Sequence, residues 1–386
     1  MEPKEKKKRK TNCKKSRIQS IPTDLTIEIL SRLPEKSVAR FSCVSKLWSS
    51  ITSDPSFPRS RLLLCFQKHN DLFVSSIPHH NPNSNRSYSS SLSFDHHHMT
   101  KLPLHFDRYQ STSGLICFVL NNPIVWNPST RQSITLPAIP TPCKDWNKVE
   151  LFLGYDPIEG KHKLVCVPYK RTCYVCRVFT LGSSQESWRT VKTNCRHRPT
   201  GYTYGQCIEG VIYYLASSLE GDDRVVMSFD VRSEKFDMIR LPSNSDWDVL
   251  ITYKGRLGLC REIHYGITHI RLWILKDAEK HNWSGQDFLL PFDAVDNGLR
   301  SKAFKLKGFT HAGEFIYVPE MTSQSSYILL CDPVRNSWRK FEFKGIADEV
   351  SVHNGVVEEE EEKQDDEHRP MYALLAFPNH IDSQIS

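Results

Sequence analysis

Short apolar segments that each follow a glycine recur through most of the chain, and this repeat limits the folds that the chain can adopt. The segments begin at Gly114, Gly160, Gly210, Gly255 and Gly313, with spacings of 46, 50, 45 and 58 residues. Short antiparallel strands with a period near 45 to 50 residues are typical of the blades of a β-propeller. The repeat therefore predicts a propeller, and an irregular β-sandwich with coincidental spacing is the alternative.

Most repeats also contain two apolar segments separated by a turn, as in "VWNPSTRQSITLP" and "YILLCDPVRNSWRKFEF". The Asn-Pro or Asp-Pro pair favours a tight turn, because proline fixes φ and the Asx side chain caps the turn. We expect the aromatic residues that follow, Phe236 and Trp338, to pack on the returning strand. The terminal segment "MYALLAF" (371–377) predicts a last strand that joins the first blade and closes the ring.

The positive charge lies almost entirely at the N-terminus. The chain has 386 residues and a net charge of +7, and residues 1–17 contain nine Lys or Arg and two acids, which leaves 42 bases and 42 acids elsewhere. This balance argues against a nucleic-acid partner. Three interpretations of the tail stay open: a nuclear address, a solvated tail, or a contact with nucleic acid. The nuclear-address candidate consists of Lys6, Lys7, Lys8, Arg9 and Lys10.

Neither a secretory signal nor a segment of about 18 apolar residues is visible, so we expect no membrane partner and a location in the nucleus, the cytoplasm or both. The twelve cysteines are then expected to be reduced thiols. The composition divides the chain into a disordered basic tail (1–17), a helical module (18–58) and a β-rich domain (61–380). Within that domain we predict a polar loop at 78–100 and a disordered acidic insert at 356–369, which contains eight acids.

No pattern of residues predicts catalysis, a cofactor or a metal site. Cys173 and Cys176 form a single C-x-x-C pair in a strand-like context, whereas a structural zinc site needs a second pair. The histidines at 79–80 and 96–98 lie in the predicted polar loop. "GYDPIEGKH" (154–162) differs from a phosphate-binding loop in its glycine spacing, and we interpret it as a hairpin turn.

The segment 20–51 has a different periodicity from the rest of the chain. Leu25, Ile29 and Leu33 recur at helical spacing between Pro22 and Pro34, which suit the start and the end of a helix. A second helix is expected to be capped by Ser37 and to carry Val38, Phe41, Val44, Trp48 and Ile51. Two short antiparallel helices bury too little apolar surface to be stable alone, so this module is expected to pack against another surface.

The same segment, "IPTDLTIEILSRLPEKSVARFSCVSKLWSSI", resembles an F-box. The segments "VWNPSTR", "GYDP", "KHKLV", "SFDVRSEKF" and "LWILKDAEKHNWS" resemble the plant F-box-associated domain, over roughly 61–345. The resemblance implies a multidomain α+β chain, with a small all-α F-box module before a large all-β domain with kelch-like propeller blades.

The resemblance also implies a function. F-box proteins are non-catalytic substrate receptors of SCF-type (cullin-RING) ubiquitin ligases, in which the F-box binds a Skp-type linker subunit and through it a cullin. The linker-binding residues implied are Pro22, Leu25, Ile29, Leu30, Leu33, Pro34, Val38, Val44 and Trp48. The β domain would bind an unknown protein target for ubiquitination and proteasomal degradation. A non-degradative scaffold in a Skp-linker complex and a sugar-binding or enzymatic propeller are the alternatives.

Overall fold

The computed structural model of the chain consists of two compact units, Met1–Phe57 and Pro58–Ser386. The structure describes the following residues: 21–33, 35–54, 57, 60–68, 71–78, 88–92, 95–98, 108–140, 148–169, 175–184, 186–200, 204–218, 223–242, 249–265, 267–290, 304–319, 327–335, 337–343 and 373–381. Among them, no helix has the length and apolar character needed to cross a membrane.

The first unit contains three helices: α1 (Thr23–Arg32), α2 (Glu35–Val44) and α3 (Lys46–Ser53). The prediction of two helices is wrong because the second helix ends at Val44. Ser45 has an extended backbone, and its hydroxyl accepts a hydrogen bond from the Trp48 amide at 3.4 Å, so it caps a new helix. Ser37 lies inside α2 and is not its cap. Pro22 is the N-cap residue of α1, as the sequence predicts.

A small apolar core holds the helical module together. Leu30, Ile51 and Phe57 are buried, and Ile27, Leu33, Val38 and Trp48 pack against them. The Trp48 ring also meets the Phe41 ring edge to face, with 5.3 Å between the centroids. These contacts bring α1 and α2 against α3.

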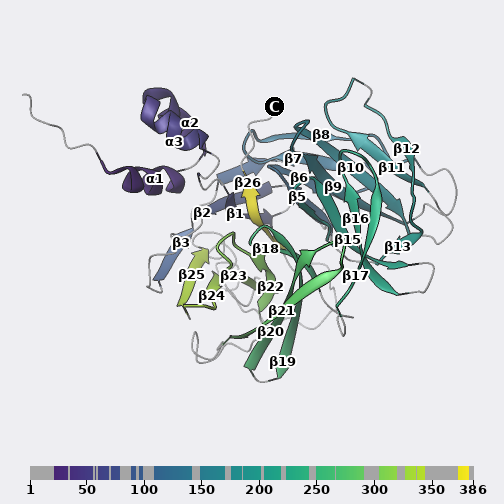
Figure 1. Ribbon diagram of the computed structural model, residues 1–386. Helices are drawn as coiled ribbons and strands as arrows, with labels where there is room; N and C mark the ends of the chain where they lie inside the picture. Colours follow the sequence, from purple (N-terminus) through teal and green to yellow (C-terminus); the bar gives the residue numbers. More distant parts are fainter. Residues whose placement is uncertain are drawn as a thin grey trace, which may run out of the picture. The chain divides into compact units, whose positions relative to one another are not determined.

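The second unit is a β-propeller of six blades, which confirms the predicted fold (Figure 1). The strands of each blade pair antiparallel, apart from one parallel strand added to blade 6, and the blades follow one another around the ring in the order of the chain. Blade 1 contains β26 (Ala373–Ile381), β1 (Ser60–Lys68), β2 (Asp71–Pro78) and β4 (Asp95–His98). Blade 2 contains β5 (Tyr109–Thr112), β6 (Leu115–Phe118), β7 (Ile124–Asn127) and β8 (Gln132–Thr135). Blade 3 contains β9 (Val149–Asp156), β10 (Lys161–Pro168), β11 (Val175–Thr180) and β12 (Arg189–Lys192).

The other three blades vary this plan. Blade 4 contains β13 (His197–Pro199) and β14 (Gln206–Ile208), which both pair with β15 (Val211–Ser218), then β16 (Arg224–Asp230) and β17 (Phe236–Arg240). Blade 5 contains β18 (Val249–Tyr253), β19 (Arg256–Tyr265), β20 (Ile267–Asp277) and β21 (Asn282–Leu290). Blade 6 contains β22 (Phe304–Phe309), β23 (Phe315–Pro319), β24 (Tyr327–Asp332) and β25 (Ser337–Phe343), with β3 (Tyr88–Leu92) added parallel to β25.

The last strand closes the ring, as predicted. β26 pairs antiparallel with β1, with Leu64 opposite Ala376 and Ser60 opposite Ile381. It is the inner strand of a blade whose other strands come from the start of the domain. Two inner strands of neighbouring blades, β5 and β22, contact it, so no inner edge of blade 1 is left open.

Each of the repeated glycines lies in the hairpin turn between the first and second strands of one of blades 2 to 6. All five have positive φ: Gly114 (86°), Gly160 (67°), Gly210 (83°), Gly255 (74°) and Gly313 (91°). In three of these turns the preceding residue also has positive φ, which matches the two-residue type I′ hairpin turn. The predicted hairpin at 154–162 is confirmed, because β9 pairs with β10 across it.

Asx side chains close the other tight turns. The Oδ1 atom of Asn127 accepts hydrogen bonds from the amides of Ser129 and Thr130, and that of Asp332 accepts them from Val334 and Arg335. These turns join the third and fourth strands of their blades, as predicted. Phe236 and Trp338 follow such turns, and both lie in the cores between blades. The Phe236 ring also packs on Phe229 of the preceding strand, with 4.7 Å between the ring centroids.

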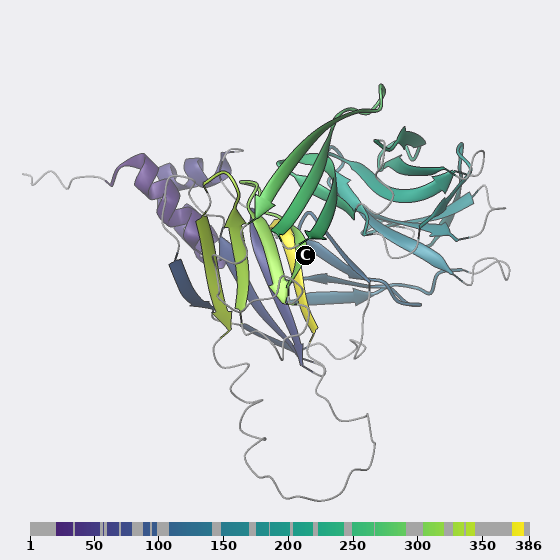
Figure 2. The ribbon, with the colours of Figure 1, turned by 90° about the horizontal axis from the view of Figure 1, so that it is seen from below.

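The two ends of the ring therefore differ. We call one the turn end, because the hairpins between strands one and two and between strands three and four lie there. At the opposite loop end the chain passes from blade to blade through longer connections, such as those between β8 and β9 and between β25 and β26. Figure 2 shows the strands of the blades from the side. The chain enters the propeller at the turn end, where Ser60 begins β1.

Side chains link the inner strands around the ring. The Gln110 amide on β5 donates to Leu151 O at 2.9 Å and accepts from Leu153 N at 2.8 Å, both on β9. The Thr252 hydroxyl on β18 donates to Gln206 on β14 at 2.9 Å. Asn379 on β26 donates to Phe309 O on β22 at 3.0 Å. These bonds fix the blades relative to one another near the channel.

The range 78–100, predicted as a polar loop, contains two strands. β4 (Asp95–His98) pairs with β2, and β3 pairs with β25 of the neighbouring blade. Both pairings are made by backbone groups, which do not require apolar side chains, so a polar composition did not reveal them. The acidic insert at 356–369 and the basic tail lie outside the described residues.

Candidate functional site

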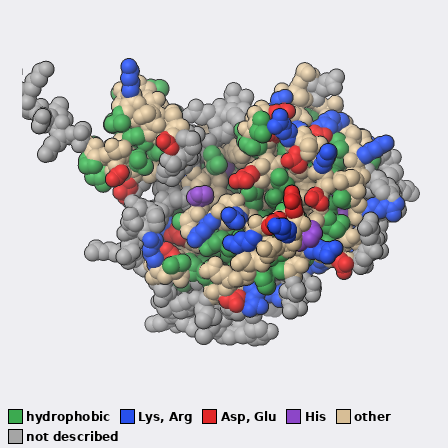
Figure 3. Space-filling view, in the orientation of Figure 1, with side chains coloured by type: hydrophobic (Ala, Val, Ile, Leu, Met, Phe, Trp, Pro, Cys, Tyr) green, Lys and Arg blue, Asp and Glu red, His purple; other side chains and the backbone are tan. Residues whose placement is uncertain are grey.

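Large apolar side chains are exposed on the surface of the helical module. On and next to α1 they are Ile21 (54% exposed), Leu25 (51%) and Ile29 (50%), and Val44 at the end of α2 is 74% exposed. Figure 3 shows apolar side chains on the surface of this module. Patches of this kind on a small domain mark protein interaction sites.

Helix α1 presents apolar residues on two sides. Leu25 and Ile29 are four residues apart and share one face, whereas Leu30 and Ile27 point into the core of the module. A helix in a monomeric domain usually has one apolar stripe. The second stripe of α1 is therefore not used by the core of the helical module.

The structure separates the nine implied linker-binding residues into three groups. Pro22, Leu25, Ile29 and Val44 are exposed. Leu30 is buried with 3% exposure, and Leu33, Val38 and Trp48 are half-buried against the same core. Pro34 lies outside the described residues, as do Lys6, Lys7, Lys8, Arg9 and Lys10 of the nuclear-address candidate.

Two exposed residues were not among the implied contacts. Phe41 (37% exposed) and Leu47 (50%) lie on α2 and α3. α3 is a new helix that begins after Ser45, so its buried face does not continue the buried face of α2. Leu47 lies on the exposed side of α3 for this reason. The cap signature of Ser45 followed by Trp48 could have indicated this break in the sequence.

A cluster of polar side chains inside the propeller holds two neighbouring blades together. The Lys163 Nζ atom donates to Val231 O at 2.7 Å and to Glu234 Oε1 at 2.8 Å, and Arg189 also binds Glu234, so this cluster joins blades 3 and 4. Burial raises the pKa of Glu234, but hydrogen bonds from Arg189 and Lys163 outweigh it and leave that pKa lowered.

The cysteine pair and the histidines that the sequence singles out lie on strands where the structure describes them. Cys176 lies buried on β11, where burial raises the pKa of its thiol to about 12, and Cys173 lies outside the described residues. His96 is exposed on β4 and its ring lies 5.2 Å from that of Phe73. The described part of the chain contains no cluster of three His, Cys, Asp or Glu side chains suited to a metal ion.

Comparison with known proteins gives a consistent family assignment. Residues 18–60 match the family model of the F-box domain, and residues 61–381 match that of the F-box associated beta propeller domain. Relatives in Arabidopsis thaliana carry F-box protein in their names. At1g47790 is 49% identical over 100% of both chains, and At3g10240 is 50% identical over 98% of this chain and 96% of its own.

Solved structures with a similar arrangement are distant. An oligogalacturonate lyase in complex with manganese covers 72% of this chain and 77% of its own, at 7% identity and a TM-score of 0.37. Similarity at this level says nothing about activity. The two family models together span the helical module and the propeller, and we conclude that the chain belongs to the F-box proteins with an F-box-associated β-propeller domain.

Proposed function

We propose that this protein is a substrate-recognition adaptor of an SCF-type ubiquitin ligase. The exposed apolar surface of the helical module binds a Skp-type linker subunit and through it a cullin. The propeller binds a protein target, which is then ubiquitinated and degraded. Membership of the F-box family supports the linker contact.

The observation that carries the proposal is the second apolar stripe of α1. Leu25 and Ile29 are half exposed, although Leu30 and Ile27 already provide the inward face of the helix. Burying an apolar side chain of this size contributes about 1.5 to 3 kcal/mol. A partner that covers Ile21, Leu25, Ile29 and Val44 therefore gains substantial free energy, which the module alone does not use.

In this role the protein needs no catalytic residues of its own. It holds the target close to the ubiquitin-charged enzyme, and the gain in rate comes from effective concentration. The rigid ring of six blades suits this task because it keeps the bound target at a fixed distance from the point where the propeller chain begins.

The test is a pull-down of a purified Skp-type linker with the full chain and with the Leu25→Asp/Ile29→Asp variant. We expect the variant to lose linker binding, because two carboxylates would be buried in an apolar interface. Ser50→Asp, at an exposed polar position on α3, is the matched control and should bind as well as the unchanged chain. Undiminished linker binding by the double variant would refute the linker contact.

Degradation requires its own measurement, because a scaffold in a Skp-linker complex would give the same pull-down result. Proteins captured on the propeller should have a longer half-life in cells that express only the Leu25→Asp/Ile29→Asp variant. If the half-lives of all captured proteins are the same with either chain, the protein is a non-degradative scaffold.

A further inference from the structure

The fourth strand of blade 2, β8, differs from the fourth strands of the other blades in its lack of charge. β8 has the sequence QSIT, and the next segment, LPAIP, extends the uncharged stretch over residues 132–140. Charged residues occur in every other fourth strand, namely β4, β12, β17, β21 and β25. Charged side chains on edge strands discourage pairing with another chain. β8 lacks this protection.

The edge of β8 is also exposed. β8 is the outermost strand of its sheet, and no described strand pairs with it on the side away from β7 (Figure 1). All four of its residues are exposed, and the side chain of Ile134 is 45% exposed. An apolar residue on an open strand edge favours the addition of a further strand.

One hydrogen bond shows which backbone groups of β8 point outward. Leu136 N donates to Pro123 O at 2.8 Å, in the register of the β7–β8 ladder. Pairs that exchange hydrogen bonds alternate with pairs that do not in an antiparallel ladder. The backbone groups of Ser133 and Thr135 therefore point away from β7. Among the described residues, no hydrogen bond to these outward groups is present.

Blade 4 shows how side chains cover such an edge. The Asn194 side chain donates to Phe236 O at 2.9 Å and accepts from Phe236 N at 3.2 Å, at the start of the outer strand β17. At the end of this strand, the Trp283 indole of blade 5 donates to Arg240 O at 2.9 Å. Both ends of the β17 edge are thus occupied from within the chain.

Blade 6 shows how a strand covers such an edge. The segment YSSSL forms β3, which pairs with the outer strand β25 from Tyr88 opposite Arg339 to Leu92 opposite Phe343. Leu92 packs against the core between blades 6 and 1. In this propeller, an uncharged segment of five residues with one apolar anchor therefore forms a fifth strand of a blade.

An apolar anchor also has a place beside β8. Leu136 and Val125 belong to the core between blades 2 and 3, and Ile134 shares their face of the sheet because it lies opposite Val125. The Trp188 indole of blade 3 donates to Pro137 O at 3.0 Å, which fixes the chain just after β8. A side chain packed beside Ile134 would extend this core outward.

We propose that the outer edge of β8 pairs with an extended, uncharged segment of the target protein, which adds a fifth strand to blade 2 and packs a branched apolar side chain beside Ile134. This inference rests on the proposed function, since it names the class of target segment that the propeller recognises. Main-chain hydrogen bonds to Ser133 and Thr135 hold the segment, and the side chain beside Ile134 selects it. A charge at the anchor position would lose its water against an apolar surface.

A second copy of this chain is the other occupant to consider. Stable interfaces between two proteins bury about 1,200 to 2,000 Å². A ladder along a strand of four residues provides a small part of such an area. A flexible target segment needs less area, because its main-chain hydrogen bonds provide the affinity. The observations therefore favour a target segment, and dimerisation is measured as an outcome of the test.

The probe is a fluorescein-labelled peptide, Gly-Ser-Thr-Ser-Ile-Ser-Thr-Ser-Gly, whose binding to the full chain is measured by fluorescence anisotropy. We expect saturable binding to the unchanged chain. Ile134→Asp should bind at least about tenfold more weakly, because its carboxylate lies where the apolar anchor packs. Ile158→Asp, at a 71% exposed position in the turn between β9 and β10, is the matched control and should bind within about twofold of the unchanged chain.

Two further changes test the backbone pairing itself. Ser133→Pro removes an outward N–H group of β8 and leaves the bonds to β7 in place. In the peptide, N-methylation of the Ile amide and of the preceding Ser amide blocks both edges. Each change should weaken binding at least about tenfold. Urea unfolding verifies that the variants are folded, and the N-methylated peptide tests the pairing on the unchanged chain in any case.

Several results would overturn the inference. These are no saturable binding of the peptide, equal binding by the unchanged chain and Ile134→Asp, and equal binding of the N-methylated peptide or of a peptide with Asp in place of Ile. A dimer in sedimentation velocity that Ile134→Asp dissociates would assign the edge to a second copy instead. Ile134→Asp should still bind the Skp-type linker in the pull-down, so failure of this inference is distinguishable from failure of the proposed function.

Discussion

The hydroxyl of Tyr214 donates a hydrogen bond of 2.5 Å to the Nε2 atom of His197, inside the core between blades 3 and 4. The other ring nitrogen, Nδ1, donates to Cys195 O at 3.1 Å. With one nitrogen accepting and the other donating, His197 is held as the neutral imidazole. Burial lowers its pKa to about 4, although the bond to Cys195 opposes the shift.

This arrangement predicts that the propeller loses stability in mild acid. His162 behaves similarly: it is buried, Nε2 donates to Thr112 O at 3.2 Å, and burial lowers its pKa to about 4. Between pH 6.5 and 4 the unfolded chain binds protons at these histidines and the folded chain does not. The free energy of unfolding therefore falls as pH falls through this range, by up to roughly 3 kcal/mol for each histidine.

Urea unfolding at pH 7, 6 and 5 checks this prediction. The His162→Gln/His197→Gln variant should have a flatter dependence on pH, and His311→Gln, at an exposed position, should leave the dependence unchanged. A double variant with the same pH dependence as the unchanged chain would show that other groups cause the loss.

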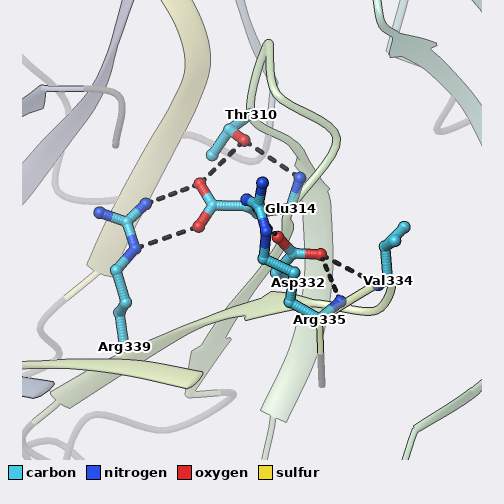
Figure 4. A network of polar contacts seen from close by, with 6 residues as sticks. All are labelled: Thr310, Glu314, Asp332, Val334, Arg335 and Arg339. Atoms are coloured by element: carbon cyan, nitrogen blue, oxygen red, sulfur yellow. Dashed lines mark hydrogen bonds and ion pairs between the residues drawn. The ribbon is translucent and has the colours of Figure 1, made fainter. Parts of the chain in front are cut away.

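Blade 6 contains a buried ion pair, and we expect mutation of one of its partners to destabilise the propeller (Figure 4). Arg339 binds Glu314 through two bonds, of 2.6 and 3.1 Å, and the Thr310 hydroxyl donates to Glu314 at 3.1 Å. Arg339 and Glu314 are 4% and 5% exposed. Glu314→Gln should lower the free energy of unfolding by about 3 kcal/mol, because it removes the carboxylate charge that lies against the buried Arg339 guanidinium.

Replacing both partners separates the charge from the packing. Glu314→Leu/Arg339→Met should be less destabilising than Glu314→Gln, since it removes the buried charges together. Denaturant unfolding of the single and double variants measures the difference. A double variant that is the less stable of the two would mean that the ion pair contributes net stability.

The sequence predicts the propeller but shows only five of its six repeats, and the structure explains why. Each visible repeat is marked by the glycine of the hairpin between the first and second strands of a blade. Blade 1 has no such hairpin, because its first strand is β26 and its second is β1, at opposite ends of the domain. A local pattern cannot reveal a pairing between residues that are more than 300 positions apart, such as Leu64 and Ala376.

In the helical module the sequence predicts which positions are apolar, but it does not predict which of these side chains face the core and which face the solvent. Leu25, Ile29 and Leu30 are all apolar, yet the first two face outward and the third forms the core. The direction of each side chain depends on where α3 packs, and that depends on the break at Ser45. The links between the inner strands could not be predicted for a similar reason: Gln110 and Leu153 are 43 positions apart in the sequence and meet only when blades 2 and 3 pack together.

The glycine turns allow a direct measurement of backbone strain. Gly255 has a φ of 74°, and a Cβ atom placed on it would meet nothing within 4 Å. Gly255→Ala should therefore cost about 1 kcal/mol through the left-handed backbone alone, and Gly255→Asn less, because Asn tolerates this conformation. Urea unfolding of the two variants gives the comparison. Equal costs for Ala and Asn would argue against this turn geometry.

Closure of the ring by β26 predicts that the end of the chain is essential for the whole propeller. Removing residues 373–386 exposes the β1 edge and takes away the buried side chains of Leu375 and Phe377. Such a chain should lose cooperative unfolding, because β5 and β22 lose their inner neighbour. Phe377→Ala, a milder change, should cost about 3 to 5 kcal/mol through the cavity that it leaves. Ile381→Ala, at a position that is 42% exposed, is the control and should cost about 0.5 kcal/mol or less. If the shortened chain still unfolds cooperatively at the original urea midpoint, β26 does not hold the ring together.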